Sequence, residues 1–213
     1  IMILMGIDSS TPQSSVALVK DGQVIEQAQV DSDSISNQVL VLIDRILVNS
    51  RTKLNDLDGF CLTVGPGSFT GLRIGASILK GLLLATSKPF VKIDTLESIA
   101  LMAMPINKKI CTILDAKKKE LYTAYFQPTT QIPERLSPDR ALTPNQLCQE
   151  IKEPTVFIGN GLDSYGDFLA SELKEKFLPE PENHLYTVAA CATRIAEKRF
   201  ISEKTNNLGS LKI

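Results

Sequence analysis

The chain has 213 residues, of which 43% are hydrophobic, and its 23 basic and 24 acidic residues leave a formal net charge of -1. This apolar content excludes a fibrous or disordered chain and is enough for one sizeable core or two small lobes. The near-neutral charge excludes a general attraction to phosphates, so any contact with RNA has to be local.

The first part of the chain reads as an antiparallel meander followed by alternating helices and strands. Asp21-Gly22 is a hairpin turn signal between two apolar runs. A strand that feeds a parallel neighbour needs a helical crossover, so this order predicts a five-stranded mixed sheet covered by helices. We expect strands at Met2–Ile7, Ser15–Lys20, Gln23–Val30 and Leu57–Val64, and helices at Asn37–Asn49 and Thr70–Thr86.

A second meander follows Met104-Pro105, and the stretch 127–144 is rich in Pro and Thr. The predicted class is therefore α/β with two lobes, the first over residues 1–104 and the second, smaller one over 105–213. The final helix could pack back on the first lobe. We expect strands at Lys109–Leu114, Glu120–Phe126 and Thr155–Ile158, a short helix after Pro144, a loop at Pro179–Asn183, and helices at Ser164–Leu173 and Val188–Phe200.

The cysteines and the apolar runs bear on where the protein works. No two cysteines form a Cys-x-x-Cys pair, which argues against a zinc site and a disulfide framework. The apolar runs fall short of the roughly 18 residues of a membrane span, and the first residues show no leader pattern. We expect a cytoplasmic protein without membrane contact. We interpret the cysteines as small buried side chains in a reducing compartment: Cys61, Cys111, Cys148 and Cys191.

The turn after the first strand resembles a phosphate loop. In Asp8-Ser9-Ser10-Thr11 an acidic residue ends the strand and hydroxyl side chains make the turn. The first phosphate loop of the actin, sugar kinase and Hsp70 superfamily has this form; its turn approaches nucleotide phosphates, and its acidic residue organises a metal or water. The alternative is an ordinary hairpin turn in which the Asp side chain caps backbone amides.

A glycine-rich segment, GPGSFTGLRIG at residues 65–75, follows a predicted strand and opens a predicted helix. It is not a Walker loop, and it departs from the GxGxxG fingerprint because Thr70 stands at the third glycine. Ser68 or Thr70 caps the helix, and Gly71 and Gly75 give it one smooth face that can lie close to another backbone. The amides at its start could bind an anion. Gly67 and Ser68 thus join Asp8, Ser9, Ser10 and Thr11 in a candidate, degenerate nucleotide or phosphate loop.

This segment is very similar to the hallmark sequence of the TsaB (YeaZ) family. Further similarity runs from Ile3 to Leu18 and through Leu114-Asp115-Ala116-Lys117 and Glu120-Leu121-Tyr122, so the resemblance covers most of the chain. It implies a tandem two-lobe actin/Hsp70-like (ASKHA, ribonuclease H-like) fold. It also implies a non-catalytic scaffold that acts with TsaD and TsaE to form N6-threonylcarbamoyladenosine (t6A) beside the anticodon of tRNAs reading codons that begin with adenine. TsaC supplies the carbamoyl-adenylate, and tRNA is reached only through the complex.

Two departures from the family pattern stand out. The family's first helix usually begins with a His beside a small hydroxyl residue, whereas this chain has Ser36-Asn37-Gln38. The family often ends near a Pro-x-Tyr-Leu-Arg segment, whereas this chain ends with Asn207–Ile213. The contacts of the carboxyl-terminal tail are therefore expected to differ.

The residues argue against catalysis by this chain alone. TsaD carries a His-x-x-x-His metal pair, but this chain has one histidine, His184, so we expect no metal site and no catalytic residues. The alternative is a small ASKHA-type phosphotransferase or ATPase, for which only Gly159-Asn160-Gly161 suits the adenosine. We expect no cofactor of its own, although a weak ADP or ATP contact shared with a partner stays open. A free-standing RNA-binding module lacks a basic stripe with aromatics, and its densest cationic run is Lys117-Lys118-Lys119.

The first two helices are predicted to form the docking face for TsaD and, in its absence, a face for homodimer formation. Each carries apolar residues around most of its circumference, although a helix that covers one side of a sheet should have a polar outer face. In the TsaB family these helices pack against the equivalent pair of TsaD as a four-helix bundle. The predicted partner-binding residues are Val39, Leu42, Ile43, Ile46, Gly71, Gly75, Leu79, Leu82 and Leu83.

Overall fold

The structure, a computed structural model, describes residues 1–31, 35–180, 184–202 and 205–211. The chain forms two compact units, unit 1 from residues 1–98 and 186–213 and unit 2 from residues 99–185. The first boundary lies at residues 98 and 99 rather than at the expected 104 and 105. The last helix packs back on the first lobe, as the sequence allowed, and the tail joins it there. The chain passes from one unit to the other within helix α3 (Thr95–Met102).

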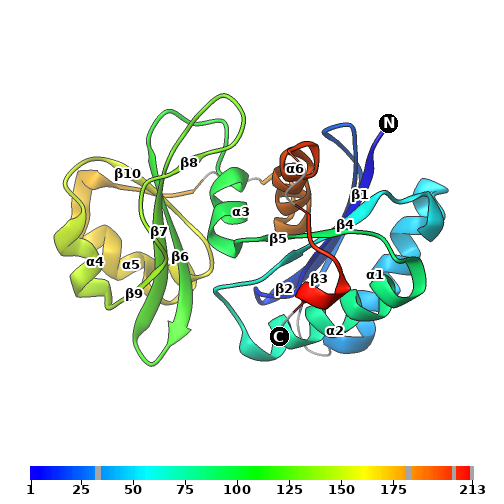
Figure 1. Cartoon of the computed structure of the whole chain (residues 1–213). Helices are drawn as coiled ribbons and strands as arrows, with labels where there is room; N and C mark the ends of the chain where they lie inside the picture. Colours follow the sequence, from blue (N-terminus) through cyan, green and yellow to red (C-terminus); the bar gives the residue numbers. More distant parts are fainter. Residues whose placement is uncertain (32–34, 181–183, 203–204, 212–213) are drawn as a thin grey trace. The chain divides into compact units, whose positions relative to one another are not determined.

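Unit 1 is built on a five-stranded mixed sheet with the order β3-β2-β1-β4-β5 (Figure 1). The first three strands form the antiparallel meander, and β1 also pairs in parallel with β4. The predicted five-stranded mixed sheet is confirmed. The position of its last strand, β5, was not predicted. The strands are β1 (Ile3–Asp8), β2 (Gln13–Lys20), β3 (Gln23–Asp31), β4 (Gly59–Thr63) and β5 (Phe90–Ile93).

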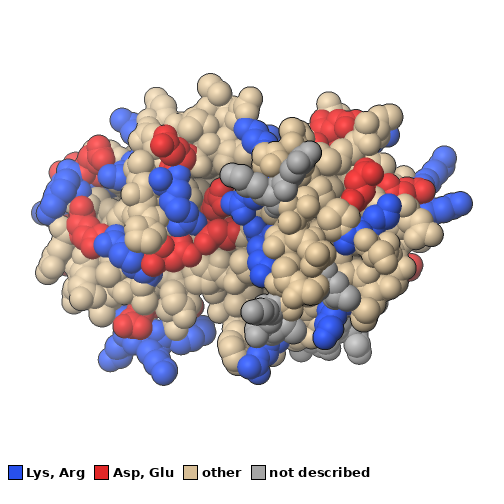
Figure 2. Space-filling model, viewed as in Figure 1, with Lys and Arg blue, Asp and Glu red and all other residues tan. Residues whose placement is uncertain are grey.

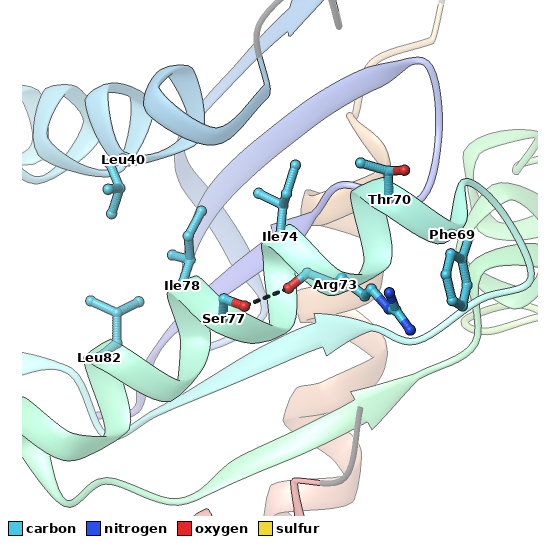
Figure 3. A pocket seen from close by; sticks show the side chains of 9 residues that line it. Leu40, Phe69, Thr70, Arg73, Ile74, Ser77, Ile78 and Leu82 are labelled. Atoms are coloured by element: carbon cyan, nitrogen blue, oxygen red, sulfur yellow. Dashed lines mark hydrogen bonds between the residues drawn. The ribbon is translucent and has the colours of Figure 1, made fainter.

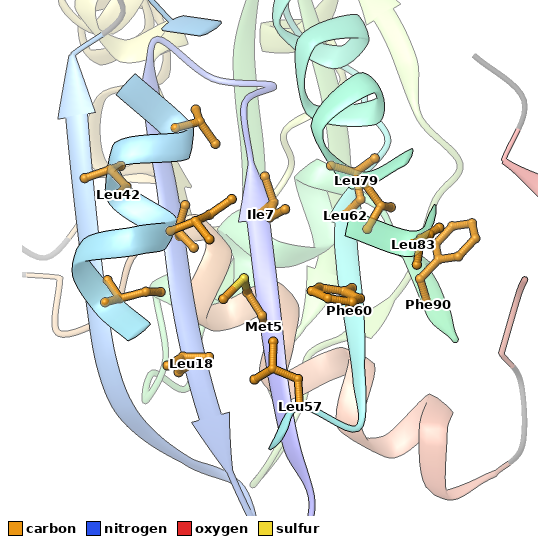
Figure 4. Close-up of a cluster of buried hydrophobic side chains, with 14 of the residues drawn as sticks. Met5, Ile7, Leu18, Leu42, Leu57, Phe60, Leu62, Leu79, Leu83 and Phe90 are labelled. Carbon is orange, nitrogen blue, oxygen red and sulfur yellow. The ribbon is translucent and has the colours of Figure 1, made fainter. Parts of the chain in front are cut away.

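Helices α1 (Ile35–Ser50) and α2 (Phe69–Thr86) cover one face of this sheet. Successive side chains of a strand point to opposite faces, so Met5 and Ile7 of β1 face these helices. Phe60 and Leu62 of β4 join them in one buried cluster with residues of both helices (Figure 4). The core of unit 1 therefore lies between the sheet and α1 and α2.

Helix α6 (Val188–Ile201) covers the opposite face, where the sheet presents small side chains. Ala17 packs with Ala189 and Ala190, and a Cβ on Gly6 would overlap the side chain of Thr193. Small residues on both partners let helix and sheet approach closely, which explains why α6 belongs to unit 1 although it follows unit 2 in the sequence. Beyond α6, Asn206 pairs with Phe90 of β5 through two backbone hydrogen bonds of 2.7 and 2.9 Å.

Unit 2 is built on a six-stranded sheet in which β11-β10-β6-β7-β8 is the main order and β9 also pairs with β7. Helices α4 (Pro144–Glu150) and α5 (Gly161–Leu173) pack on it around Phe157, Leu147 and Leu169. The predicted meander is confirmed as the antiparallel pair of β6 (Lys109–Lys117) and β7 (Glu120–Gln127). The other strands are β8 (Glu134–Arg135), β9 (Arg140–Leu142), β10 (Thr155–Ile158) and β11 (Phe177–Leu178). In the described part of the chain, short 3-10 helices lie at Lys174–Lys176 of unit 2 and at Leu54–Asp56 and Leu208–Ser210 of unit 1.

Candidate partner-docking site

The predicted phosphate loop is a closed, internally bonded turn. Asp8 is fully buried, and its carboxylate accepts hydrogen bonds from the backbone and hydroxyl of Ser10 and from the hydroxyls of Thr11 and Thr63. Burial raises the pKa of the Asp8 carboxyl above its ordinary value of 3.8, although these hydrogen bonds oppose the rise. Ser9 and Ser10 are buried as well, and the Ser9 hydroxyl donates to the Gly71 carbonyl at 2.8 Å.

The glycine-rich segment packs directly against this turn. The Ser68 amide donates to the Ser10 carbonyl at 2.8 Å, and the Ser68 hydroxyl caps α2 by accepting from the Gly71 amide at 3.2 Å. A Cβ on Gly67 would overlap the Ser10 carbonyl, one on Gly71 the Ser9 carbonyl, and one on Gly75 the Ser9 hydroxyl. The motif thus lets α2 begin directly against the first turn, and the close approach expected of Gly71 and Gly75 takes place inside unit 1.

Most of the predicted partner-binding residues lie in the core, which corrects the expectation. Leu82 alone among the leucines and isoleucines predicted to bind the partner is partly exposed. Both helices carry apolar residues around their circumference, so the sequence pattern did not reveal which stripe the sheet would cover. The buried set is Val39, Leu42, Ile43, Ile46, Leu79 and Leu83, together with Gly71 and Gly75.

A different set of side chains lines a groove between the outer faces of α1 and α2 (Figure 3). Leu40 of α1 points toward Ile78 and Leu82 of α2 across the groove, and Phe69 and Arg73 lie at its other end. Its volume of about 720 Å³ lies within the range of small-molecule pockets, so its lining rather than its size indicates the ligand. The lining is mainly apolar: Leu40, Phe69, Thr70, Arg73, Ile74, Ser77, Ile78, Gly81 and Leu82.

Arg73 and Phe69 lie together at one end of the groove. The Arg73 guanidinium lies 3.9 Å from the centre of the Phe69 ring, a cation-π contact, while Phe69 stays 66% exposed. The Ser77 hydroxyl donates to the Arg73 carbonyl of its own helix at 2.8 Å and so is already occupied. Other large apolar side chains of α1 and α2 are also exposed: Val41, Val48 and Leu84. Sequence reasoning did not select Leu40 or Phe69, because their exposure depends on which stripe the sheet buries.

Gly81 sits on the groove without a neighbour. A Cβ built there would meet no atom within 4 Å, in contrast to those built on Gly71 and Gly75. Glycine inside a helix costs about 1 kcal/mol relative to alanine. Nothing within unit 1 offsets this cost, whereas a partner backbone crossing α2 at Gly81 would use the missing side chain.

The remaining reactive side chains include four cysteines and one histidine. The expected burial is confirmed for three cysteines, and burial raises the pKa of each of their thiols to about 12. Cys148 is partly buried. The His184 Nε2 atom lies 3.3 Å from the Glu180 carboxylate, and no three of the described His, Cys, Asp and Glu residues gather as they would around a metal ion. Helix α2 is long and apolar enough to span a membrane by length and composition alone.

Solved structures share this fold. YeaZ from Pseudomonas aeruginosa superposes with a TM-score of 0.80 at 19% identity and covers 99% of this chain and 98% of its own. Component A of the (R)-2-hydroxyglutaryl-CoA dehydratase of Acidaminococcus fermentans gives 0.58 at 13% identity over 93% and 99%. The predicted two-lobe actin/Hsp70-like fold is confirmed.

Sequence comparison gives the family. TsaB of Haemophilus influenzae, a tRNA threonylcarbamoyladenosine biosynthesis protein, is 28% identical over 94% of this chain and 89% of its own length. TsaB of Escherichia coli is 34% identical over 59% of this chain and 55% of its own. Residues 29–198 match the family described as TsaD: tRNA N6-adenosine threonylcarbamoyltransferase. The chain belongs to this family. The curated relatives named here are TsaB proteins.

Of the two departures from the TsaB pattern, the structure describes one in part. The side chains of Ser36 and Asn37, which replace the usual His, lie outside the described residues. The tail from 205 to 211 lies along the sheet of unit 1, where the Ser210 carbonyl accepts from the Lys92 ammonium at 2.9 Å and Leu211 packs against the core. The described tail therefore closes the β5 edge of the sheet.

Proposed function

We propose that the chain is a non-catalytic accessory subunit of the threonylcarbamoyl-transfer machinery and that the groove between α1 and α2 binds TsaD. The supporting observation is an exposed apolar surface on these two helices in a chain of the TsaB family. A helix pair that met only water would carry polar side chains on this side. Burying Leu40, Phe69 and their exposed neighbours would contribute roughly 1.5 to 3 kcal/mol each before the costs of association.

The partners and the place of action follow from the same proposal. TsaD and TsaE assemble with this chain in the cytoplasm, TsaC supplies the activated carbamoyl group, and tRNA is bound by the complex. Without TsaD, the same apolar surface supports a homodimer, because it has no other cover among the described residues.

The proposal gives the chain no cofactor of its own. Asp8 and the hydroxyls of Ser9 and Ser10 are held inside unit 1 by hydrogen bonds, so the turn offers few free groups to a phosphate. An ADP or ATP contact would be weak and shared with a partner. A phosphotransferase or ATPase would instead need these groups to face its nucleotide.

The test is a charge placed in the groove. Leu40→Glu should weaken TsaD binding at least tenfold and lower t6A formation by the reconstituted complex, because the carboxylate must be buried against apolar side chains. Leu40 is 51% exposed, so the free chain should keep its stability. Isothermal titration against TsaD and urea unfolding measure the two effects.

The matched control is Leu136→Glu in unit 2, where a leucine of the same kind is 49% exposed outside the groove. This variant should bind TsaD as the wild type does. Wild-type affinity of Leu40→Glu, or an equal loss in both variants, would contradict the assignment of the docking site.

A further inference from the structure

The turn between β6 and β7 places lysine in a conformation that lysine disfavours. Lys117 and Glu120 form the last pair of the two strands, so Lys118 and Lys119 make a two-residue hairpin loop. Their φ angles are 51° and 64°, and Lys117 has a φ of 63°. A two-residue loop with positive φ at both positions is the kind in which Asn-Gly is strongly preferred.

Folding alone does not account for three lysines here. A side chain at positive φ brings its Cβ close to the backbone, and glycine or asparagine relieves this strain. Residues kept in strained conformations concentrate at functional sites. The lysines are all exposed, which makes their charge the property that distinguishes them from the residues the turn prefers.

Asp115 holds one of the three lysines of the turn in place. Asp115 accepts a hydrogen bond from the Lys117 amide at 2.7 Å and pairs with the Lys117 ammonium at 3.0 Å. Partial burial would raise the pKa of Asp115, but these hydrogen bonds and the lysine charge lower it below its ordinary value, which keeps the carboxylate ionised. Lys118 and Lys119 extend beyond this pair. Figure 2 shows blue side chains gathered at the lower end of unit 2, where the β6–β7 hairpin ends in Figure 1.

We propose that this hairpin, residues 117–119, binds the phosphate backbone of the tRNA on which the complex acts. The inference rests on the proposed function, in which the complex acts on tRNA, a polyanion. The net charge of the chain is -1, so attraction to tRNA has to come from a local cluster of positive charge. Lysine is a point charge that suits phosphates without reading base sequence. The hairpin tip presents no apolar side chain. Protein interfaces are usually anchored by such side chains, so the tip suits a phosphate backbone better than a protein surface.

The experiment replaces the turn by the sequence that its backbone prefers. In Lys118→Asn/Lys119→Gly the strain and two charges disappear together, so the free chain should melt about 2 to 4 °C higher. The assembled complex with TsaD and TsaE should bind unmodified tRNA about tenfold more weakly at moderate salt. The negative slope of log K against log salt concentration should become less steep by about one to two.

The control is Lys108→Gln/Lys152→Gln, which removes two exposed charges from unit 2 away from the turn. This variant should keep the wild-type salt slope. Assembly with TsaD, measured on the same preparations, separates the two proposals: a wild-type chain that fails to bind TsaD contradicts the proposed function itself. Normal assembly with unchanged tRNA affinity in the turn variant overturns the hairpin site, and so does a loss of assembly, which would make the turn a protein contact.

Discussion

Asp8 illustrates how burial changes the meaning of a motif residue. Its neighbours in the sequence are those of a phosphate loop, but the side chain ends inside unit 1, where it accepts hydrogen bonds from Ser10 and Thr11 of the turn and from Thr63 of β4. A buried carboxylate is tolerated only when its hydrogen bonds replace water. The residue therefore ties the turn after β1 to the end of β4.

The raised pKa of Asp8 predicts a pH dependence with a definite sign. A carboxyl with a raised folded-state pKa contributes stability that is fully present below its unfolded value of 3.8 and is lost as the pH rises through the folded value. The free energy of unfolding of Asp8→Asn, relative to wild type, should therefore increase as the pH rises through this window and then level off. Urea unfolding at a series of pH values measures the difference.

A flat profile for Asp8→Asn, or one that runs in the opposite direction, would contradict the burial of an ionisable carboxyl at this position.

At the scale of one element, α2 uses glycine in two opposite ways. Gly71 and Gly75 face the first turn, where any side chain would overlap the backbone or hydroxyl of Ser9. Gly81 faces the groove, where a side chain would meet nothing. The first two glycines therefore serve the packing of unit 1, whereas the third weakens the free helix and packs against no described residue.

Alanine at these positions should change stability with opposite signs. Gly71→Ala should lower the free energy of unfolding by about 1 to 3 kcal/mol through overpacking. Gly81→Ala should raise it by about 1 kcal/mol through helix propensity and yet weaken TsaD binding, if the partner backbone crosses there. Urea unfolding and titration with TsaD measure the pair; a Gly81→Ala variant that is less stable than wild type would show that the outer face of α2 is misplaced.

At the scale of the whole molecule, the features argued above belong to different units. The apolar groove and the closed turn at Asp8 belong to unit 1, whereas the strained lysine turn belongs to unit 2. The described residues of neither unit gather three side chains of the kinds that bind a metal ion. An accessory role therefore needs partners to supply the chemistry.

The purified chain alone should not transfer threonylcarbamoyl to tRNA, and product should form only when TsaD, TsaE and TsaC are added. Chromatography of the nucleosides from digested tRNA detects the modified adenosine. Turnover by the isolated chain that is abolished by Asp8→Ala would refute the accessory role, because it would place catalysis at the β1 turn.

Much of the fold was predictable because its signals are local. The meander, the crossover helices and the turn at Asp21-Gly22 depend on neighbouring residues, and the structure confirms them. Helix α5 begins at Gly161 rather than Ser164, since its first turn lacks an apolar repeat. The short β8 and β9 fall within the stretch rich in Pro and Thr, where only pairing with β7 defines them as strands.

The sequence by itself determined the α/β class, the five-stranded sheet and, through one glycine-rich segment, the family. These depend on the spacing of residue types along the chain, which the sequence contains in full. Only the tertiary structure decided which stripe of α1 and α2 is buried, where α6 packs, and that the glycines of α2 serve two different surfaces. Burial is a property of contacts between segments far apart in the sequence, and a helix that is apolar all round carries no local mark of the side that the sheet will cover.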